Sequence, residues 1–372
     1  MLSRLLFLSL IAAQLFAASP ITVETGEIAG AKFTLARPGN WNKRLLLLAH
    51  GYRADDRPLV ADLFPEHLAC RALLDEGWMI AKTSYRRNGI IVADAIADLD
   101  ALRGHVAKNF GVPERVLVEG ESMGGLIATL LAERDSANDE RGRPKYHGAV
   151  AIGAALVIAE SGRDVPLSLV PHIPLLFLTN QSELDGPRGY VTRSQADHPD
   201  PNLRPALFRV SRDGHVNVNQ RERLAALRAL NEWLERGRMM LPEPAAKADF
   251  FDATVPPEPQ PSKIVLRADA RGFDTHITEV SGNYGNVALD AQPADFAAIG
   301  VGVMQYFELT AHGQSFRVRL GRDFSSVPRG EWVAFPNADG FYWLARNFGD
   351  AAATAKLQLG DAVTLRRYGE AK

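Results

Sequence analysis

The feature that most constrains the fold of this chain is a short glycine-rich turn, carrying one serine, between a predicted strand and a predicted helix. Residues 116–119 can form a buried strand, the pentapeptide GESMG occupies residues 120–124, and a helical segment begins at Leu126. A serine on so sharp a turn needs small neighbours, because the backbone there is strained and crowded. The N-terminus of the helix would also favour negative charge near that serine. The sequence therefore predicts that Ser122 is a nucleophile.

Strand-like and helix-like segments alternate on both sides of this motif. We expect strands at residues 33–36, 45–49, 79–84, 116–119, 149–152, 175–179 and 206–210. We expect helices at residues 68–76, 90–109, 126–133 and 221–235. Such alternation, with nearly continuous apolar strands, indicates a mostly parallel sheet covered by helices on both faces. The predicted fold class of this part is α/β.

A serine hydroxyl is a weak nucleophile unless a base takes its proton. His215 is the histidine in a suitable place, because it follows the predicted strand 206–210 in a short loop. Its imidazole needs a carboxylate that fixes the tautomer. Glu183 and Asp185 both follow the predicted strand 175–179, and Glu183 has the expected spacing. The sequence leaves either of them as the third member of a catalytic triad.

Two backbone N–H groups are expected to bind the oxyanion of the reaction intermediate. One belongs to Met123, directly after the serine, and the other to Tyr52, after the predicted strand 45–49. Arg86 and Arg87 follow the predicted strand 79–84, at the edge of the sheet where ligands bind. This arginine pair is a candidate for holding a carboxylate or phosphate, and ordinary surface pairing is the alternative.

The first 19 residues are typical of an export signal. Arg4 precedes an apolar run at residues 5–16, and small residues follow at 17–19. We expect the mature protein to be secreted or periplasmic and without stable membrane association, with an uncleaved membrane anchor as the alternative. The single cysteine, Cys70, cannot form an intramolecular disulfide, and we interpret it as a buried apolar residue.

Charge and motif content favour a small-molecule substrate. The formal net charge is -2 and no basic stripe is evident, so nucleic acid is not an expected partner. The sequence contains no C-x-x-C, H-E-x-x-H or Walker motif. No metal and no cofactor are therefore predicted.

A proline-rich segment at residues 241–262 divides the chain. Such a composition is stiff and extended, so we interpret it as a linker. The α/β domain then covers residues 20–240, and a second domain covers residues 263–372. Short strand-like segments at 264–267, 276–280, 315–320 and 362–366 predict a β-barrel or sandwich there.

The first domain resembles the α/β-hydrolases over residues 23–235. The resemblance is carried by residues 120–124, by His50-Gly51, and by the order serine, acid, histidine along the chain. It implies hydrolysis of an ester, or alternatively an amide, through an acyl-enzyme. Glu183 would depart from the commoner aspartate of that family. The segment between the strands that end at 152 and begin at 175 is short, so we expect no large lid.

The second domain resembles the C-terminal domain of the S-adenosylmethionine hydroxide adenosyltransferase family over residues 263–367. SGNYGNVALDA and the stretch from DFSSVPRGEW onward carry this resemblance. It implies that Tyr284, Asn286 and Asn337 occupy positions that can touch adenine, and it suggests a homotrimer. The N-terminal domain of that family is absent here. Two further hypotheses are therefore binding of an adenosyl compound and a non-catalytic binding protein on a hydrolase scaffold.

Overall fold

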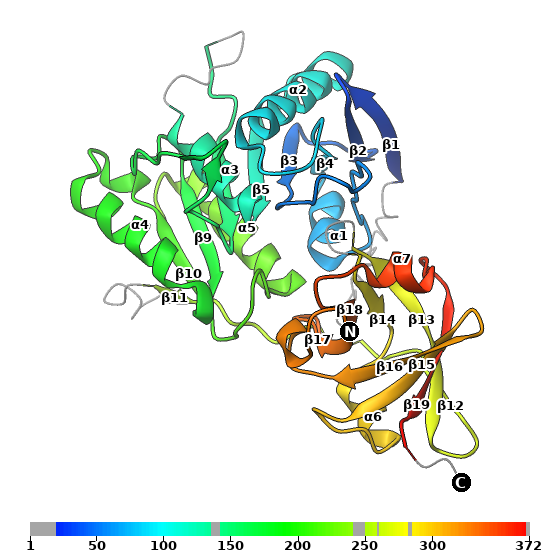
Figure 1. Ribbon diagram of the computed structural model, residues 1–372. Helices are drawn as coiled ribbons and strands as arrows, with labels where there is room; N and C mark the ends of the chain where they lie inside the picture. The colour runs from blue at the N-terminus through cyan, green and yellow to red at the C-terminus, as the bar shows by residue number, and fades with distance from the viewer. Residues whose placement is uncertain (1–19, 135–141, 241–249, 259, 282–284, 370–372) are drawn as a thin grey trace, which may run out of the picture.

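The computed structural model describes residues 20–134, 142–240, 250–258, 260–281 and 285–369. It contains a large sheet flanked by helices and a separate β-barrel (Figure 1). The predicted signal, residues 241–249 and 259 of the predicted linker, and Tyr284 lie outside the described residues. Within the described ranges, no helix combines the length and the apolar character that crossing a membrane requires.

The large sheet has nine strands in the order β1-β2-β4-β3-β5-β6-β9-β10-β11. These strands are β1 (Ile21–Ile28), β2 (Ala31–Pro38), β3 (Arg44–Ala49), β4 (Met79–Thr83), β5 (Arg115–Glu121), β6 (Gly148–Ile152), β9 (Leu175–Asn180), β10 (Ala206–Val210) and β11 (Phe251–Asp252). Strands β1 and β2 pair antiparallel, β2 also pairs antiparallel with β4, and every other pairing in this sheet is parallel. The predicted mostly parallel sheet is confirmed.

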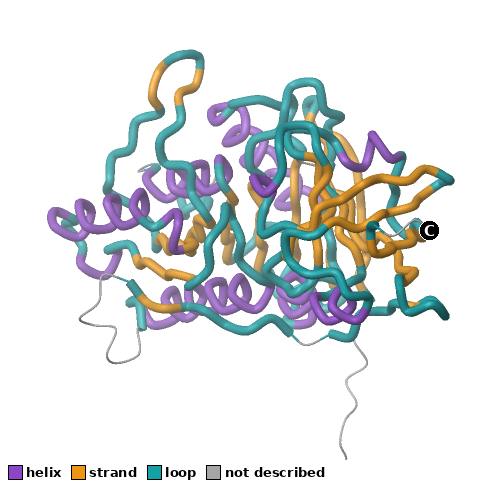
Figure 2. The backbone as a smooth tube through the Cα atoms, turned by 60° about the horizontal axis from the view of Figure 1, so that its bottom comes forward, coloured by secondary structure: helices purple, strands orange, loops and turns teal. Residues whose placement is uncertain are grey.

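Helices cover both faces of this sheet (Figure 2). They are α1 (Leu68–Asp75), α2 (Val92–Phe110), α3 (Met123–Glu133), α4 (Asp185–Asp197) and α5 (Gln220–Arg236), with the short 3-10 helices η1 (Gln181–Glu183) and η2 (Pro201–Leu203). One apolar core joins the sheet to α2, α3 and α4 through residues such as Leu99, Leu131 and Tyr190. The other joins it to α1 and α5 through Leu73 and Trp233. This two-sided burial explains why the central strands are nearly all apolar.

Part of the predicted linker belongs to the sheet. Phe251 and Asp252 form β11, which pairs in parallel with β10. The ring of Phe251 packs on that of Phe208 with centroids 4.9 Å apart, and Asp252 forms an ion pair of 2.7 Å with Arg209. The described part of residues 241–262 is therefore not simply a spacer, because one aromatic side chain and one carboxylate fit the exposed edge of β10.

A small hairpin interrupts the connection between β6 and β9. It consists of β7 (Ala159–Glu160) and β8 (Arg163–Asp164), and it projects away from the sheet (Figure 2). Val157, at its base, is 91% exposed. The connection is thus a narrow arm, in keeping with the expectation that no large lid forms here.

The second domain is a barrel that closes on itself. Its strands are β12 (Val265–Leu266), β13 (Gly272–Val280), β14 (Val287–Leu289), β15 (Tyr306–Ala311), β16 (Gln314–Leu320), β17 (Trp332–Pro336), β18 (Tyr342–Arg346) and β19 (Ala362–Arg367), and the helices α6 (Pro293–Ala298), η4 (Phe324–Ser326) and α7 (Ala351–Ala355) join them. The order is β12-β13-β14-β18-β17-β16-β15-β19, and β19 pairs back onto β13. Edge-to-face contacts of Phe296 with Phe273, Phe307 and Tyr342 fill the interior.

Candidate active site

Ser122 lies between the end of β5 and the start of α3. Its φ is 56°, a left-handed backbone conformation that a non-glycine residue adopts at a cost. The N–H of Ser122 donates to the carbonyl of Ile152 at 2.9 Å, and its carbonyl accepts from Ala155 at 3.1 Å. The end of β6 and the loop that follows it therefore hold both backbone groups of the strained residue.

The glycines around the serine are required by close backbone contacts. A Cβ on Gly120 would overlap the carbonyl of Gly124, and a Cβ on Gly124 would overlap the carbonyl of Ala49. A Cβ on Gly125 would lie 2.8 Å from the Cα of Ala154. The GESMG motif thus brings α3 against the ends of two strands, which points the serine away from the sheet.

The structure brings His215 to Ser122, although 92 residues separate them in the sequence. The Nε2 of His215 lies 2.8 Å from the Oγ of Ser122. On the other side of the ring, Nδ1 contacts Oε1 of Glu183. This hydrogen bond raises the pKa of His215, while partial burial of the ring opposes the increase. The three side chains form a continuous chain of hydrogen bonds from hydroxyl to imidazole to carboxylate.

Glu183, and not Asp185, is the carboxylate that reaches the histidine. Glu183 ends the short helix η1 after β9, whereas Asp185 is an exposed residue at the start of α4. The loop that carries His215 is fixed beside β9, because the N–H of Asn217 donates to Oδ1 of Asn180 at 2.8 Å. The position of the acid is therefore set by the turn immediately after the strand.

The two predicted oxyanion donors lie on segments that flank the serine. Met123 is the first residue of α3, so its N–H is one of the donors that have no partner within the helix. Gly51 lies so close that a Cβ on it would be 3.7 Å from the Oγ of Ser122. Tyr52, directly after Gly51, carries a side chain that is 40% exposed. The backbone after β3 thus passes beside the nucleophile.

His50 is a buried, neutral part of this turn. Its ring packs at a tilt of 31° against that of Tyr85 with centroids 4.0 Å apart, and its Nδ1 lies 2.7 Å from the carbonyl of Gly51. Burial, with the nearby charges of Arg53 and Lys82, lowers the pKa of His50 to about 3. His50 therefore shapes the backbone beside Ser122 and does not carry a positive charge there.

The two arginines after β4 have carboxylate partners on α2. The Nε of Arg86 donates to Oδ1 of the buried Asp98 at 2.9 Å, and its backbone N–H donates to Oδ2 at 2.8 Å. Arg87 forms an ion pair of 2.7 Å with Asp94. Both arginines thus have carboxylate partners, which fits the surface-pairing alternative, and a role of the pair in holding a substrate anion stays a prediction.

The predicted ligand contacts of the barrel are also engaged in local structure. Oδ1 of Asn337 accepts the N–H groups of Asp339 and Phe341, both at 3.0 Å, and thereby forms the turn between β17 and β18. The backbone carbonyl of Asn286 accepts from the N–H of Ser281 at 2.7 Å. Asn337 thus determines the shape of a turn that faces the first domain.

A largely buried network of charged side chains beside Ser122 was not anticipated from the sequence. Arg223 of α5 forms ion pairs with Glu119, at 2.5 Å, and with Glu121, the residue before the serine. Burial raises the pKa of Glu119, whereas the charge of Arg223 lowers that of Glu121 against the effect of burial. The sequence shows a glutamate inside GESMG, but no local pattern pairs it with an arginine 102 residues away.

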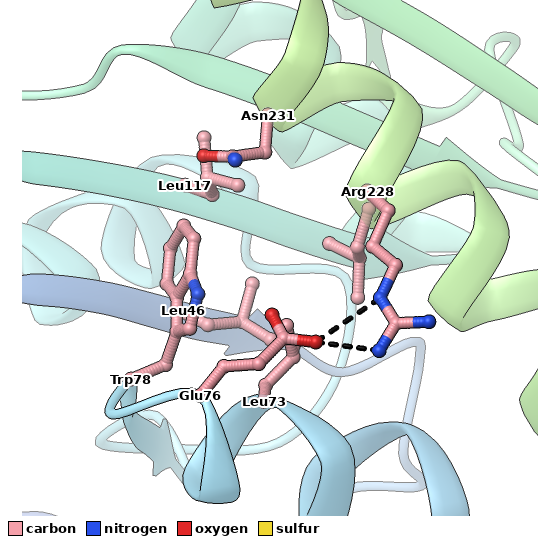
Figure 3. Close-up of a pocket in the computed structure, with 8 residues that line it drawn as sticks. Leu46, Leu73, Glu76, Trp78, Leu117, Arg228 and Asn231 are labelled. Atoms are coloured by element: carbon pink, nitrogen blue, oxygen red, sulfur yellow. Dashed lines mark hydrogen bonds and ion pairs between the residues drawn. The ribbon is translucent and has the colours of Figure 1, made fainter. Parts of the chain in front are cut away.

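A pocket between α1 and α5 contains none of the candidate catalytic residues (Figure 3). Leucines of β3, β5 and α1 form its floor, and Arg228 bonds Glu76 across its mouth with distances of 3.1 and 2.5 Å. It is a packing gap on one face of the sheet. Among the residues that the structure describes, no group of three or more histidine, cysteine or acidic side chains is arranged to hold a metal ion.

The strand order, the strained serine turn and the chain order Ser122, Glu183, His215 define the first domain as an α/β-hydrolase fold. The second domain is a closed barrel, and residues 279–364 match the family model of the SAM hydroxide adenosyltransferase C-terminal domain.

Comparison with solved structures finds similar chains at low identity. An uncharacterised conserved protein from Thermotoga maritima is 21% identical over 36% of this chain and 49% of its own, with a TM-score of 0.27. The esterase Pf2001 from Pyrococcus furiosus is 16% identical over 59% and 93%, with a TM-score of 0.42. A putative dienelactone hydrolase from Klebsiella pneumoniae is 18% identical over 59% and 95%, with a TM-score of 0.40. A comparison with curated proteins found no match.

Proposed function

We propose that this protein is a serine hydrolase that cleaves a carboxylic ester through an acyl-enzyme on Ser122. The observation that carries the proposal is the 2.8 Å contact between Oγ of Ser122 and Nε2 of His215, continued by the contact of His215 with Glu183. Nucleophile and base are within the distance that proton transfer requires.

In the first half of the proposed reaction, His215 takes the proton of Ser122 while Oγ attacks the ester carbonyl carbon. The negative charge moves to the carbonyl oxygen, where the N–H groups of Met123 and Tyr52 stabilise it. The tetrahedral intermediate then collapses, the bond to the leaving alcohol breaks, and His215 returns the proton to that alcohol. Glu183 keeps the ring oriented and stabilises its positive charge.

In the second half, His215 takes a proton from water, and the resulting hydroxide attacks the acyl carbon. The bond between that carbon and Oγ breaks, and Ser122 recovers the proton. An amide substrate would follow the same steps with an amine as leaving group. The side chain of His215 is 47% exposed, which supports access of water to the base.

Covalent labelling tests this proposal directly. A fluorophosphonate probe should attach to Ser122 in the full-length protein, and Ser122→Ala should abolish both labelling and hydrolysis of short p-nitrophenyl esters. Ser161→Ala is a matched control, because Ser161 is an exposed serine in the turn between β7 and β8. Folded native protein without labelling would favour the non-catalytic binding protein instead.

A second candidate function is binding of an adenosyl compound by the barrel. The observation in its favour is the family match of residues 279–364. Calorimetry with S-adenosylmethionine and with adenosine tests it, and no heat of binding at millimolar ligand would contradict it. Export to the periplasm or beyond and a homotrimer through the barrel stay predictions, which secretion assays and light scattering can check.

A further inference from the structure

The segment between β3 and α1, residues 51–67, contains turns but no helix or strand. It begins at Gly51 beside the nucleophile and includes the proposed oxyanion donor Tyr52. An oxyanion donor is effective only when it is held in place before the reaction, so the anchoring of this segment matters for catalysis.

Several contacts within the first domain hold parts of this segment. Arg53 pairs with Asp62 at 2.6 Å, and Lys82 of β4 pairs with the same carboxylate at 2.7 Å. The carbonyl of Arg53 accepts from Gly89 at 2.9 Å. The backbone turns at residues 54–57, where the N–H of Arg57 donates to the carbonyl of Ala54 at 3.0 Å, and the carbonyl of Arg57 accepts from Nδ2 of Asn88 at 2.7 Å.

The side chain of Arg57, at the end of this turn, reaches the barrel. Its Nη1 forms an ion pair with Oδ2 of Asp350, and both side chains are largely buried, with 24% and 18% of their surface exposed. Asp350 is also held by its own helix, because its Oδ1 accepts the N–H of Ala353 at 2.8 Å and caps α7. The backbone of Gly285 packs closely against this carboxylate, since a Cβ on Gly285 would overlap it.

The barrel also contacts the other catalytic segment. Oδ1 of Asp339 accepts the N–H of Gln220 at 3.0 Å, and Gln220 begins α5 five residues after His215. That segment has further anchors of its own, including the capping box of Asn219 and Glu222. The contact of Arg57 with Asp350 is therefore the stronger candidate for a catalytic effect, because its segment lacks a helix or strand.

We propose that Asp350 of the barrel is a positioning residue for the hydrolase reaction, and that it acts through Arg57 to fix the backbone of residues 51–57 beside Ser122. This inference rests on the proposed function. It assigns the barrel a part in catalysis that needs no ligand on the barrel, and it makes the complete active site a product of both domains.

Asp350→Asn gives a clean test, because asparagine caps a helix as well as aspartate but cannot form the ion pair. Arg57→Gln removes the other partner, and Arg57→Lys keeps the charge as the conservative variant. The control is Arg267→Gln, which breaks an exposed arginine–aspartate pair of 2.8 Å within the barrel. Thermal unfolding of each full-length variant establishes that it is folded.

Two measurements are made on each variant: the rate constant of fluorophosphonate labelling at Ser122, and hydrogen–deuterium exchange of the backbone in residues 51–67. We expect Asp350→Asn and Arg57→Gln each to slow labelling about ten- to a hundredfold, as a small displacement of catalytic groups does, and to speed exchange in this segment. The double variant should be no slower than either single variant, because both remove the same contact. Arg57→Lys should recover part of the rate, and Arg267→Gln should behave as the native protein.

Unchanged exchange in residues 51–67 overturns the inference, whatever the activity. Faster exchange with native labelling rates also overturns it, because the segment would then be anchored without consequence for the serine. In both cases normal labelling of the native protein leaves the proposed function intact. Absence of labelling in the native protein overturns the proposed function, and the inference falls with it.

Discussion

Oε2 of Glu183 accepts a hydrogen bond of 3.2 Å from the backbone N–H of Val216, the residue that follows His215. The second oxygen of the same carboxylate contacts Nδ1 of His215. Glu183 therefore holds both the ring and the backbone that carries it. The strained backbone of Val216, with φ of 54°, is stabilised by the same side chain.

The first prediction concerns Glu183→Gln. An amide can bind the wrong tautomer of His215, so we expect the plateau of kcat to fall about 10⁴-fold. Because Glu183 raises the pKa of His215, its loss should move the acidic limb of the pH profile of kcat/KM to lower pH. A pH series with a p-nitrophenyl ester measures both effects. Asp185→Asn is the control, and an equal loss of activity there would contradict the assignment.

The second prediction concerns Gly51→Ala. The added Cβ would lie 3.1 Å from the Cβ of Ser122 and 3.2 Å from the carbonyl of Glu121, so the nucleophile must shift. We expect kcat to fall about a hundredfold, with a much smaller change in thermal stability. The matched control is Gly104→Ala in α2, where nothing lies within 4 Å of the new methyl group. That change should stabilise the helix by about 0.5–1 kcal/mol and leave kcat unchanged.

The third prediction separates a structural from a binding role at the end of β4. Asp98 is completely buried and accepts hydrogen bonds from Arg86, so Asp98→Asn should lower the free energy of unfolding by about 2–3 kcal/mol. Asp94 pairs with the exposed Arg87, so Asp94→Asn should lower the free energy of unfolding by less than about 1 kcal/mol. Urea unfolding measures both. A variant that instead raises KM for anionic esters without loss of stability would support a role of the arginine pair in substrate binding.

The fourth prediction concerns the pH dependence of stability at the domain junction. Oε2 of Glu279 lies 3.5 Å from Nε2 of His67, and burial, together with the nearby charge of Asp62, raises the pKa of Glu279 from 4.5 to about 7. Between these pH values the folded protein keeps a proton that the unfolded chain has lost. The contribution of Glu279 to stability is therefore complete below pH 4.5 and is lost as the pH rises to about 7.

Glu279→Gln should remove this dependence. Relative to the native protein, the variant should gain at most about 3 kcal/mol at pH 8 and nothing at pH 4. Chemical unfolding at both pH values measures the difference, and the exposed Glu114→Gln serves as control. A stability difference that does not change with pH would show that folding leaves the pKa of Glu279 unchanged.

The main features of the fold follow from the sequence because its strongest patterns are local. The apolar strands, the long periodic helix α2 and the GESMG turn each satisfy one dominant preference, and the predicted boundaries differ from the observed ones by a few residues. Helix α4 was missed because its sequence, DGPRGYVTRSQAD, contains one proline and two glycines. Burial of Tyr190 and Val191 against the sheet overrides that weak propensity.

The candidate site was only partly predictable, because contacts between distant segments decide it. Chain order selects Ser122 and His215, but the choice between Glu183 and Asp185 depends on the geometry of one 3-10 turn after β9. The charge of Arg86 could not be assigned to Asp98 from spacing alone, since α2 must first pack beside β4. Contacts across the domain junction, such as that of Arg57 with Asp350, have no sequence signal at all.

The half-exposed imidazole of His215 bears on the kinetics of turnover. A base in direct exchange with bulk solvent can release its proton without any gating motion of the fold. An acyl group on a polymer or at a membrane surface can reach a base that is exposed in this way, whereas an enclosed tunnel would admit only small molecules.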